Sequence, residues 1–126
     1  MTETYVVTHD VGTTGNKSCI YRISDTIELM GSSLVEYPLY ITPDGGAEQK
    51  ADEWWAAICS ATKASMARSG IKPGQVSAMT FCAQLQGSVF VDESGRALRN
   101  PMNYMDGRST ERSEEHTSEL QSRQSI

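Results

Sequence analysis

Residues 5–23 read YVVTHDVGTTGNKSCIYRI, and this stretch predicts two strands joined by a short polar turn. Residues 5–8 are rich in β-forming side chains, and residues 10–15 contain too much glycine for a helix. Between residues 17 and 23, Cys19, Tyr21 and Ile23 fall on one face at a period of two. The chain therefore begins with an antiparallel pair of strands.

The rest of the chain predicts a mixed α/β fold. We expect a third strand at residues 27–37, interrupted at Gly31, and a loop at residues 38–48. Residues 51–69 predict a helix that ends before Gly70, with both tryptophans as packing residues. Its apolar stripe contains Trp54 or Trp55, Ile58, Thr62 and Met66. A strand at residues 75–82 and a hairpin around residues 92–95 follow. The order β-β-β-α-β with an added hairpin is typical of an α/β domain.

The composition disfavours nucleic acid and membrane as binding partners. Its 126 residues and net charge of -5 suit one domain or part of a larger one. Without a basic cluster or a run of about eighteen apolar residues, we expect no nucleic-acid partner and no membrane span. No signal peptide is recognisable at the N-terminus, and Cys19, Cys59 and Cys82 are too far apart for a zinc site. We therefore expect a cytoplasmic protein with reduced thiols.

The chain changes character after residue 110. Residues 111–126 read ERSEEHTSELQSRQSI, in which only Leu120 and Ile126 are strongly apolar. Residues 112–122 resemble the in-frame translation of a widely used short-read sequencing adapter. We therefore expect residues 111–126 to be a non-native or disordered tail. Residues 1–110 would then be the N-terminal part of a longer protein.

The glycine-rich turn can be interpreted as one of two phosphate sites, or as an ordinary hairpin with a polar turn. A Walker A loop needs a glycine directly before its lysine and a helix after it. Asn16 precedes Lys17, and a strand is predicted after it, which disfavours that interpretation. In the second site, two strands meet at a turn whose N–H groups and hydroxyls face phosphate, while an acidic residue holds Mg²⁺.

Four motifs together resemble one family. Residues 10–17, DVGTTGNK, are similar to the first phosphate motif of the FGGY carbohydrate kinases, which have an actin-like ATPase fold. Glu48-Gln49 before Trp54-Trp55, the loop QLQG at residues 84–87 and YMDGR at residues 104–108 are similar to further family motifs in the same order. The resemblance covers residues 1–110, with xylulokinases as the most similar members. It implies a truncated N-terminal lobe of an actin-like, ribonuclease H-like fold.

The resemblance implies ATP and Mg²⁺ as cofactors and assigns residues to them. Asp10 would organise Mg²⁺ and the ATP phosphates. Gly12, Thr13 and Thr14 would form the phosphate hairpin, and Lys17 would add positive charge beside the transferring group.

A second group of matched residues would serve the small-molecule sugar or polyol. Leu85 and Gln86 match the family's sugar contacts, and Gln84 offers another amide donor and acceptor. Asp106 and Arg108 match a charged pair that would either contact the ligand or brace its own loop.

Departures from the family pattern limit what the resemblance implies. Xylulokinases usually have His where Gln86 stands, so the acceptor stays open among xylulose, ribulose and other polyols. Tyr104 replaces a usual Trp. His9 stands where an apolar residue is common, and we expect a strand residue there rather than a catalytic base.

The family's catalytic aspartate, its second phosphate motif and its adenosine-binding segments lie beyond residue 126. We therefore expect this chain to be inactive alone, to expose apolar surface, and to come from a parent kinase that could be a homodimer. The alternatives are a non-sugar actin-like ATPase and a non-catalytic nucleotide-binding or interaction domain.

Overall fold

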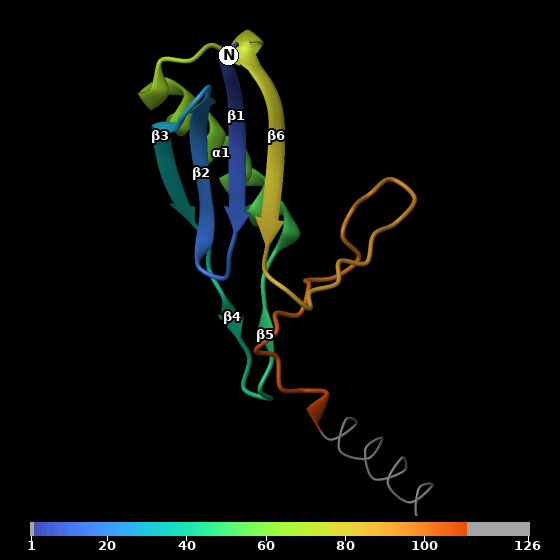
Figure 1. The fold of residues 1–126 in the computed structure, drawn as a ribbon. Helices are drawn as coiled ribbons and strands as arrows, with labels where there is room; N and C mark the ends of the chain where they lie inside the picture. The colour runs from blue at the N-terminus through green and yellow to red at the C-terminus, as the bar shows by residue number, and fades with distance from the viewer. Residues whose placement is uncertain (1, 111–126) are drawn as a thin grey trace, which may run out of the picture.

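The computed structural model describes residues 2–110, so the tail expected at residues 111–126 lies outside the described residues. Four strands form the main sheet in the order β3-β2-β1-β6 (Figure 1). They are β1 (Thr4–Val11), β2 (Gly15–Ile23), β3 (Ile27–Glu36) and β6 (Val76–Ala83). The first three form an antiparallel meander, and β6 pairs with β1 in parallel. The β-β-β-α-β order expected from the sequence is confirmed.

Helix α1 (Ala51–Ser69) has the bounds that the sequence predicts and covers one face of the sheet behind β2 and β3 (Figure 1). Its buried side chains are small: Ala57, Ala61 and Ser65 recur every fourth residue. Small side chains let the helix lie close to the sheet, where the hydroxyls of Ser18 and Ser65 are 2.8 Å apart. The larger stripe residues Trp54, Ile58, Thr62 and Met66 are partly buried beside this row.

The two tryptophans have different environments. Trp54 packs against the core cluster of Val11, Tyr37 and Ala57, as expected for a packing residue. Trp55 is 65% exposed, so the prediction that it is a packing residue is wrong. Adjacent helix positions point about 100° apart, and only one of the two can face the sheet.

Strand β3 is not interrupted at Gly31. It pairs with β2 over its whole length, and a register shift beside Gly31 leaves Met30 unpaired as a bulge. The glycine is needed for space, because a Cβ there would lie 2.8 Å from the Ser65 carbonyl oxygen of α1. The residue that predicts a break therefore marks the place where helix and strand come closest.

The connections differ from expectation in small ways. The segment predicted as loop at residues 38–48 contains two short paired strands, β4 (Tyr40–Ile41) and β5 (Ala47–Glu48). A short 3-10 helix, η1 (Pro73–Gln75), precedes β6. The hairpin predicted around residues 92–95 makes its turn but forms only one isolated bridge, between Val91 and Ala97.

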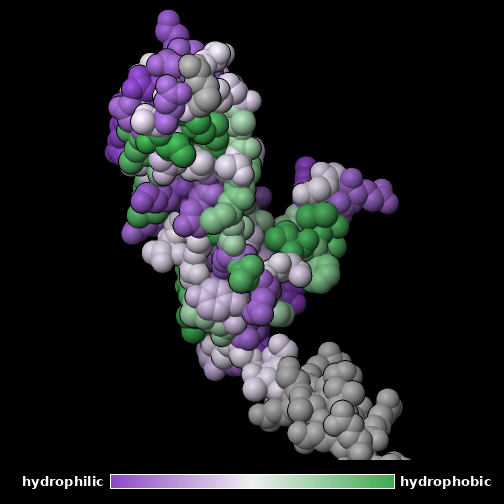
Figure 2. Space-filling view, viewed as in Figure 1, coloured by the Kyte–Doolittle hydropathy of each residue, from purple (hydrophilic) through white to green (hydrophobic). Residues whose placement is uncertain are grey.

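Strand β6 and the segment after it are exposed. Seven of the eight β6 residues are exposed, because α1 lies over β2 and β3 and leaves the β6 side of the sheet uncovered. Figure 2 shows hydrophobic side chains gathered on the segment that follows β6, where Val89, Phe90, Val91 and Leu98 are exposed. The expected exposure of apolar surface is confirmed. Within the described residues, no helix is long and apolar enough to cross a bilayer.

Gly15 provides a test of how closely β2 and β3 approach. A Cβ at Gly15 would lie 2.6 Å from the Val35 carbonyl oxygen, so Gly15→Ala must push the strands apart. We expect this substitution to lower the free energy of unfolding by about 1–3 kcal/mol, measured by urea denaturation. Gly74→Ala is the control, because nothing lies within 4 Å of a Cβ there. Equal stability of the two variants would contradict the strand spacing described here.

Candidate functional site

The candidate site lies where two parallel strands end. Val11 at the end of β1 is the register partner of Ala83 at the end of β6, and the Gln84 N–H donates to the Val11 carbonyl at 2.9 Å. This pairing brings the turn after β1 beside the loop after β6. A cavity of about 410 Å³ opens there, lined by Asp10, Gly12, Thr13, Ala83, Gln84, Leu85, Gln86 and Tyr104. Six residues that the sequence predicts for phosphate or sugar contact therefore share one cavity.

Asp10 and Lys17 face away from α1. They are cross-strand partners on β1 and β2, and both line a separate cavity of about 310 Å³ with Cys82. The Cys82 thiol donates to Asp10 Oδ1 at 3.4 Å, and this carboxylate raises the pKa of the thiol. Lys17 continues a strand rather than starting a helix, which confirms that the turn is not a Walker A loop.

Asp10 fits a magnesium site in which most ligands come from water and phosphate. Its carboxylate is exposed, and no group of three His, Cys, Asp or Glu side chains within residues 2–110 could hold a metal. Mg²⁺ characteristically uses one or two carboxylates and completes its shell with water and substrate phosphates. The single accessible carboxylate of Asp10, just before the turn between β1 and β2, meets that requirement.

His9 has the opposite orientation from Asp10 because strand residues alternate between faces. Its ring is buried under α1, with Nδ1 3.1 Å from the Asn16 amide nitrogen and Nε2 3.2 Å from the Thr62 hydroxyl. It also stacks on Phe81 of β6. Burial lowers the pKa of His9, so the ring is neutral at pH 7. His9 is thus a buried strand residue, as the sequence analysis expects.

Gln84 differs from its neighbours because its amide is already engaged. Its Nε2 donates to Gln49 Oε1 at 2.8 Å, and its Oε1 accepts from the Asn103 amide at 2.5 Å. Leu85 and Gln86 are exposed, and Gln86 has a φ of 63°. A left-handed backbone at a residue other than glycine costs free energy and is common at functional sites.

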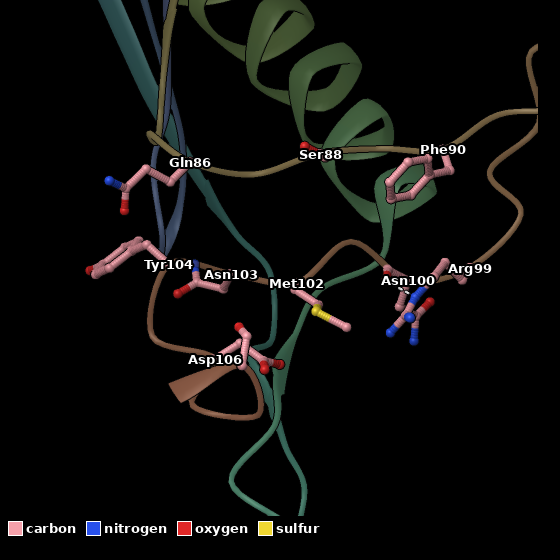
Figure 3. Close-up of a pocket in the computed structure, with 10 residues that line it drawn as sticks. Gln86, Ser88, Phe90, Arg99, Asn100, Met102, Asn103, Tyr104 and Asp106 are labelled. Atoms are coloured by element: carbon pink, nitrogen blue, oxygen red, sulfur yellow. Dashed lines mark hydrogen bonds between the residues drawn. The ribbon is translucent and has the colours of Figure 1, made fainter. Parts of the chain in front are cut away.

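Gln86 and Tyr104 also border a second cavity of about 340 Å³ (Figure 3). The Tyr104 side chain lies below Gln86 in this view, and the Thr13 hydroxyl is 3.4 Å from the Tyr104 hydroxyl. Tyr104 therefore contacts the turn between β1 and β2 and borders the space beside Gln86.

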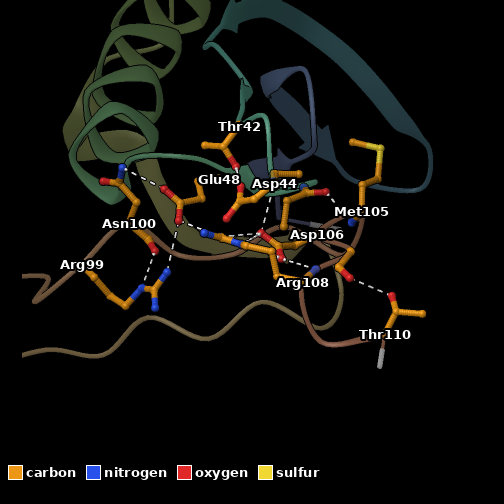
Figure 4. Close-up of polar contacts among 12 residues, drawn as sticks. Thr42, Asp44, Glu48, Arg99, Asn100, Met105, Asp106, Arg108 and Thr110 are labelled. Carbon is orange, nitrogen blue, oxygen red and sulfur yellow. Dashed lines mark hydrogen bonds and ion pairs between the residues drawn. The ribbon is translucent and has the colours of Figure 1, made fainter. Parts of the chain in front are cut away.

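Asp106 and Arg108 form an ion cluster with Glu48 of β5 (Figure 4). Arg108 Nη2 lies 2.6 Å from Asp106 Oδ2 and 2.7 Å from Glu48 Oε1. Asp106 Oδ2 also accepts the Ala47 N–H at 2.8 Å. The Arg108 guanidinium holds the pKa of both carboxyls below their usual ranges. These contacts brace the loop against β5, although Asp106 also borders the second cavity.

Three residues at the site were not predicted as site residues: Tyr37, Gln49 and Asn103. Tyr37 donates its hydroxyl to the Gly12 carbonyl oxygen, and burial together with Asp10 raises the pKa of this hydroxyl to about 12. Gln49 is 1% exposed and donates to the Thr13 carbonyl at 2.7 Å. Only Gln49 carries a sequence signal, because it belongs to the Glu48-Gln49 motif.

The ion cluster predicts acid sensitivity. Because the folded state lowers the pKa of Asp106 and Glu48, their contribution to stability is complete above their ordinary values and is lost as pH falls. We expect the urea midpoint to fall between about pH 5 and pH 3, and Arg108→Gln to reduce this dependence while lowering the midpoint at pH 7. Arg96→Gln is the control, since Arg96 makes no ion pair among the described residues. An unchanged pH dependence in Arg108→Gln would argue against the cluster.

Comparisons with known proteins agree with the geometry. The sequence model of the "FGGY family of carbohydrate kinases, N-terminal domain" matches residues 5–126. Glycerol kinase 1 of Lactiplantibacillus plantarum is 30% identical over 93 residues, which cover 74% of this chain and 18% of that protein. The glycerol kinase of Thermococcus onnurineus is 27% identical over 111 residues, covering 88% of this chain and 22% of that protein.

Solved structures show the same fold. A xyloylose kinase from Brucella ovis superposes with a TM-score of 0.81 at 23% identity, covering 90% of this chain and 24% of that one. A gluconate kinase from Lactobacillus acidophilus has a TM-score of 0.79 at 20% identity, covering 94% of this chain and 23% of that one. The chain thus spans about a fifth of the length of the relatives it matches. From its N-terminal domain motifs and this fold, the chain belongs to the FGGY family of carbohydrate kinases.

Proposed function

We propose that this chain contributes the phosphate turn and part of the acceptor site of a kinase that transfers phosphate from ATP to a sugar or polyol hydroxyl. The observation that carries the proposal is the single cavity shared by Asp10, the turn after β1 and the loop at residues 84–86. Phosphoryl transfer needs a metal ligand, hydrogen-bond donors for phosphate and an acceptor held in line. We propose that one side of the cavity would supply the first two and the other side the third.

Each side of the cavity has its own chemistry. Asp10 would hold Mg²⁺, and the turn from Gly12 to Thr14 would bind phosphate oxygens through N–H groups and hydroxyls. When bound, Mg²⁺ neutralises charge on the phosphates. Lys17 lies opposite Asp10 and adds positive charge near the same phosphates. Together these groups would hold the nucleotide's phosphates against the sheet edge.

The acceptor would lie near Leu85, Gln86 and Tyr104. Gln86 has an amide with no hydrogen-bond partner among the described residues, so it can both donate to and accept from hydroxyl groups. Gln84 is engaged with Gln49 and Asn103, and we propose that it supports the loop. A polyol with a mismatched hydroxyl would leave the Gln86 amide unpaired, which penalises the wrong acceptor.

We propose an acceptor from the class of sugars and polyols. The relatives compared above are glycerol kinases, whereas the similar solved structures include xylulose and gluconate kinases. One contact such as Gln86 does not define the hydroxyl pattern of an acceptor. A xylulokinase-like activity is one specific form of the proposal, and a cytoplasmic location suits it.

The chain alone is proposed to be inactive. Kinases that close two lobes around ATP and acceptor exclude water by that closure, and this chain spans about a fifth of its relatives' length. One cavity wall cannot enclose either substrate.

The proposal is tested with the longer protein, expressed from the intact reading frame and assayed for ADP release with glycerol, D-xylulose or gluconate. We expect acceptor-dependent ADP release, with kcat reduced about a hundredfold or more in Asp10→Asn because the metal ligand is weakened. Glu93→Gln is the control for charge, since Glu93 lies in the exposed turn of the 92–95 hairpin.

ATP hydrolysis that no acceptor accelerates would contradict the proposal and favour a non-sugar ATPase. Turnover of D-xylulose by the 126-residue chain alone would contradict its proposed inactivity.

Gln86 provides a separate test of the acceptor side. Gln86→Gly removes the amide while accepting the backbone φ of 63°. In the longer protein we expect the KM for the acceptor to rise about tenfold with the KM for ATP unchanged, because the lost hydrogen bonds involve only the acceptor. Ser94→Gly, in the remote hairpin turn, is the control. Equal increases in both KM values would show that Gln86 does not recognise the acceptor.

A further inference from the structure

The turn between β1 and β2 has an unusual distribution of hydrogen bonds. The carbonyl oxygens of Gly12, Thr13 and Thr14 each accept a hydrogen bond from outside the turn. By contrast, no hydrogen bond within residues 2–110 uses the N–H groups of Thr13 or Thr14. The three carbonyls are therefore occupied and the N–H groups of Thr13 and Thr14 are free, whereas the Gly12 N–H donates to the Gly15 carbonyl at 2.9 Å.

The three carbonyls are held from different parts of the fold. Tyr37, directly after β3, donates its hydroxyl to the Gly12 carbonyl and its backbone N–H to the Thr14 carbonyl at 3.1 Å. Gln49, two residues before the start of α1, donates Nε2 to the Thr13 carbonyl at 2.7 Å. Because a peptide's N–H and C=O point in opposite directions, holding the carbonyls orients the N–H groups of the following residues away from them.

The orientation of the Gln49 amide follows from its partners. The indole N–H of Trp54 can only donate, and it lies 3.2 Å from Gln49 Oε1. Gln84 Nε2 donates to the same oxygen at 2.8 Å. The remaining amide atom is therefore the nitrogen, which faces the Thr13 carbonyl and the more distant Pro38 carbonyl at 3.5 Å. With 1% exposure, Gln49 has no water to replace these partners.

We infer that Gln49 is a positioning residue, which with Tyr37 holds the turn's carbonyls inward so that its N–H groups are preorganised to bind phosphate. This inference rests on the proposed function, because it assigns phosphate to the turn. If the carbonyl oxygens faced the site instead, their partial negative charges would repel an anion. Reorienting these peptide groups when phosphate binds would then reduce the affinity. Gln49 thus acts through Thr13 and contacts no ligand itself.

The arrangement also joins the two sides of the cavity. Gln84 receives a hydrogen bond from Asn103 and donates to Gln49, which in turn holds Thr13. The loop after β6, where the acceptor is proposed to lie, is thereby connected to the turn through the partly buried amide of Gln84 and the buried amide of Gln49.

The test uses the 126-residue chain and inorganic pyrophosphate with Mg²⁺ as the probe. Backbone amide signals are followed by two-dimensional NMR during titration. In the unsubstituted chain we expect the Thr13 and Thr14 amides to shift on binding. In Gln49→Glu, whose carboxylate still accepts from Trp54 and Gln84 but cannot donate to Thr13, we expect binding to weaken about tenfold or more.

Two further variants separate the donor from other effects. Gln49→Met has no added charge, so equal weakening in Gln49→Met and Gln49→Glu assigns the effect to the lost donor. Glu53→Gln is the matched control, because it changes a neighbouring side chain that bonds Tyr40 rather than the turn. Glu53→Gln is expected to bind pyrophosphate as tightly as the unsubstituted chain.

The outcomes separate this inference from the proposed function. If pyrophosphate shifts neither Thr13 nor Thr14 in the unsubstituted chain, the phosphate turn itself is contradicted. If it shifts them equally in the unsubstituted chain and in both Gln49 variants, the turn binds phosphate but Gln49 does not position it. If only Gln49→Glu is weakened, repulsion by the new charge explains the loss and the inference is overturned.

Discussion

The buried amide of Gln49 connects the parts of the structure that form the candidate site. It bonds the indole of Trp54 in the first turn of α1, the Gln84 amide after β6 and the carbonyl of Thr13. Each partner forms one hydrogen bond with the Gln49 amide. Because Gln49 is only 1% exposed, water could not replace a lost partner, and the loss would lower the stability of the fold. The start of the helix, the end of the parallel strand and the turn of the antiparallel pair therefore have fixed relative positions.

The sheet is covered unevenly, and this decides which surfaces remain open. Small residues of α1 allow a close approach over β2 and β3, where Gly31 leaves room for the Ser65 backbone. β6 lies outside the area that the helix covers and is exposed along most of its length. The site opens at the border between these regions, where strand ends emerge from the packed part of the sheet. A rigid base and an open edge together make a turn that is both positioned and accessible.

Charge is used differently at the two ends of this region. Asp10 is exposed and shares its cavity with Lys17, so its carboxylate is available to a cation. Asp106, by contrast, is held by Arg108 and by the Ala47 N–H, and Arg108 is also paired with Glu48. The Asp10 carboxylate can therefore interact with a ligand. The Asp106 carboxylate instead helps to hold the segment that contains Tyr104 against β5.

Much of the fold could be predicted from local sequence. Helix α1 ends where the sequence predicts because Gly70 adopts a left-handed conformation, and the residues after Lys17 form the predicted strand. The turn between β1 and β2 could be predicted because its glycine and hydroxyl residues are contiguous in the sequence. The exposure of Trp55 and the continuity of β3 past Gly31 could not, because each depends on which surface α1 presents to the sheet.

For the candidate site, the sequence by itself determined the family motifs and the residues around the turn, since those are matched by type and spacing. Only the tertiary structure decided what each polar group does. Gln84 and Gln86 have the same side chain two positions apart and line the same cavity, yet the Gln84 amide is engaged by Gln49 and Asn103 while the Gln86 amide has no partner among the described residues. Tyr37 and Gln49 act on a turn that lies more than twenty residues earlier in the chain. The physical reason is that a hydrogen bond depends on distance and direction in space, and neither can be read from a residue's type.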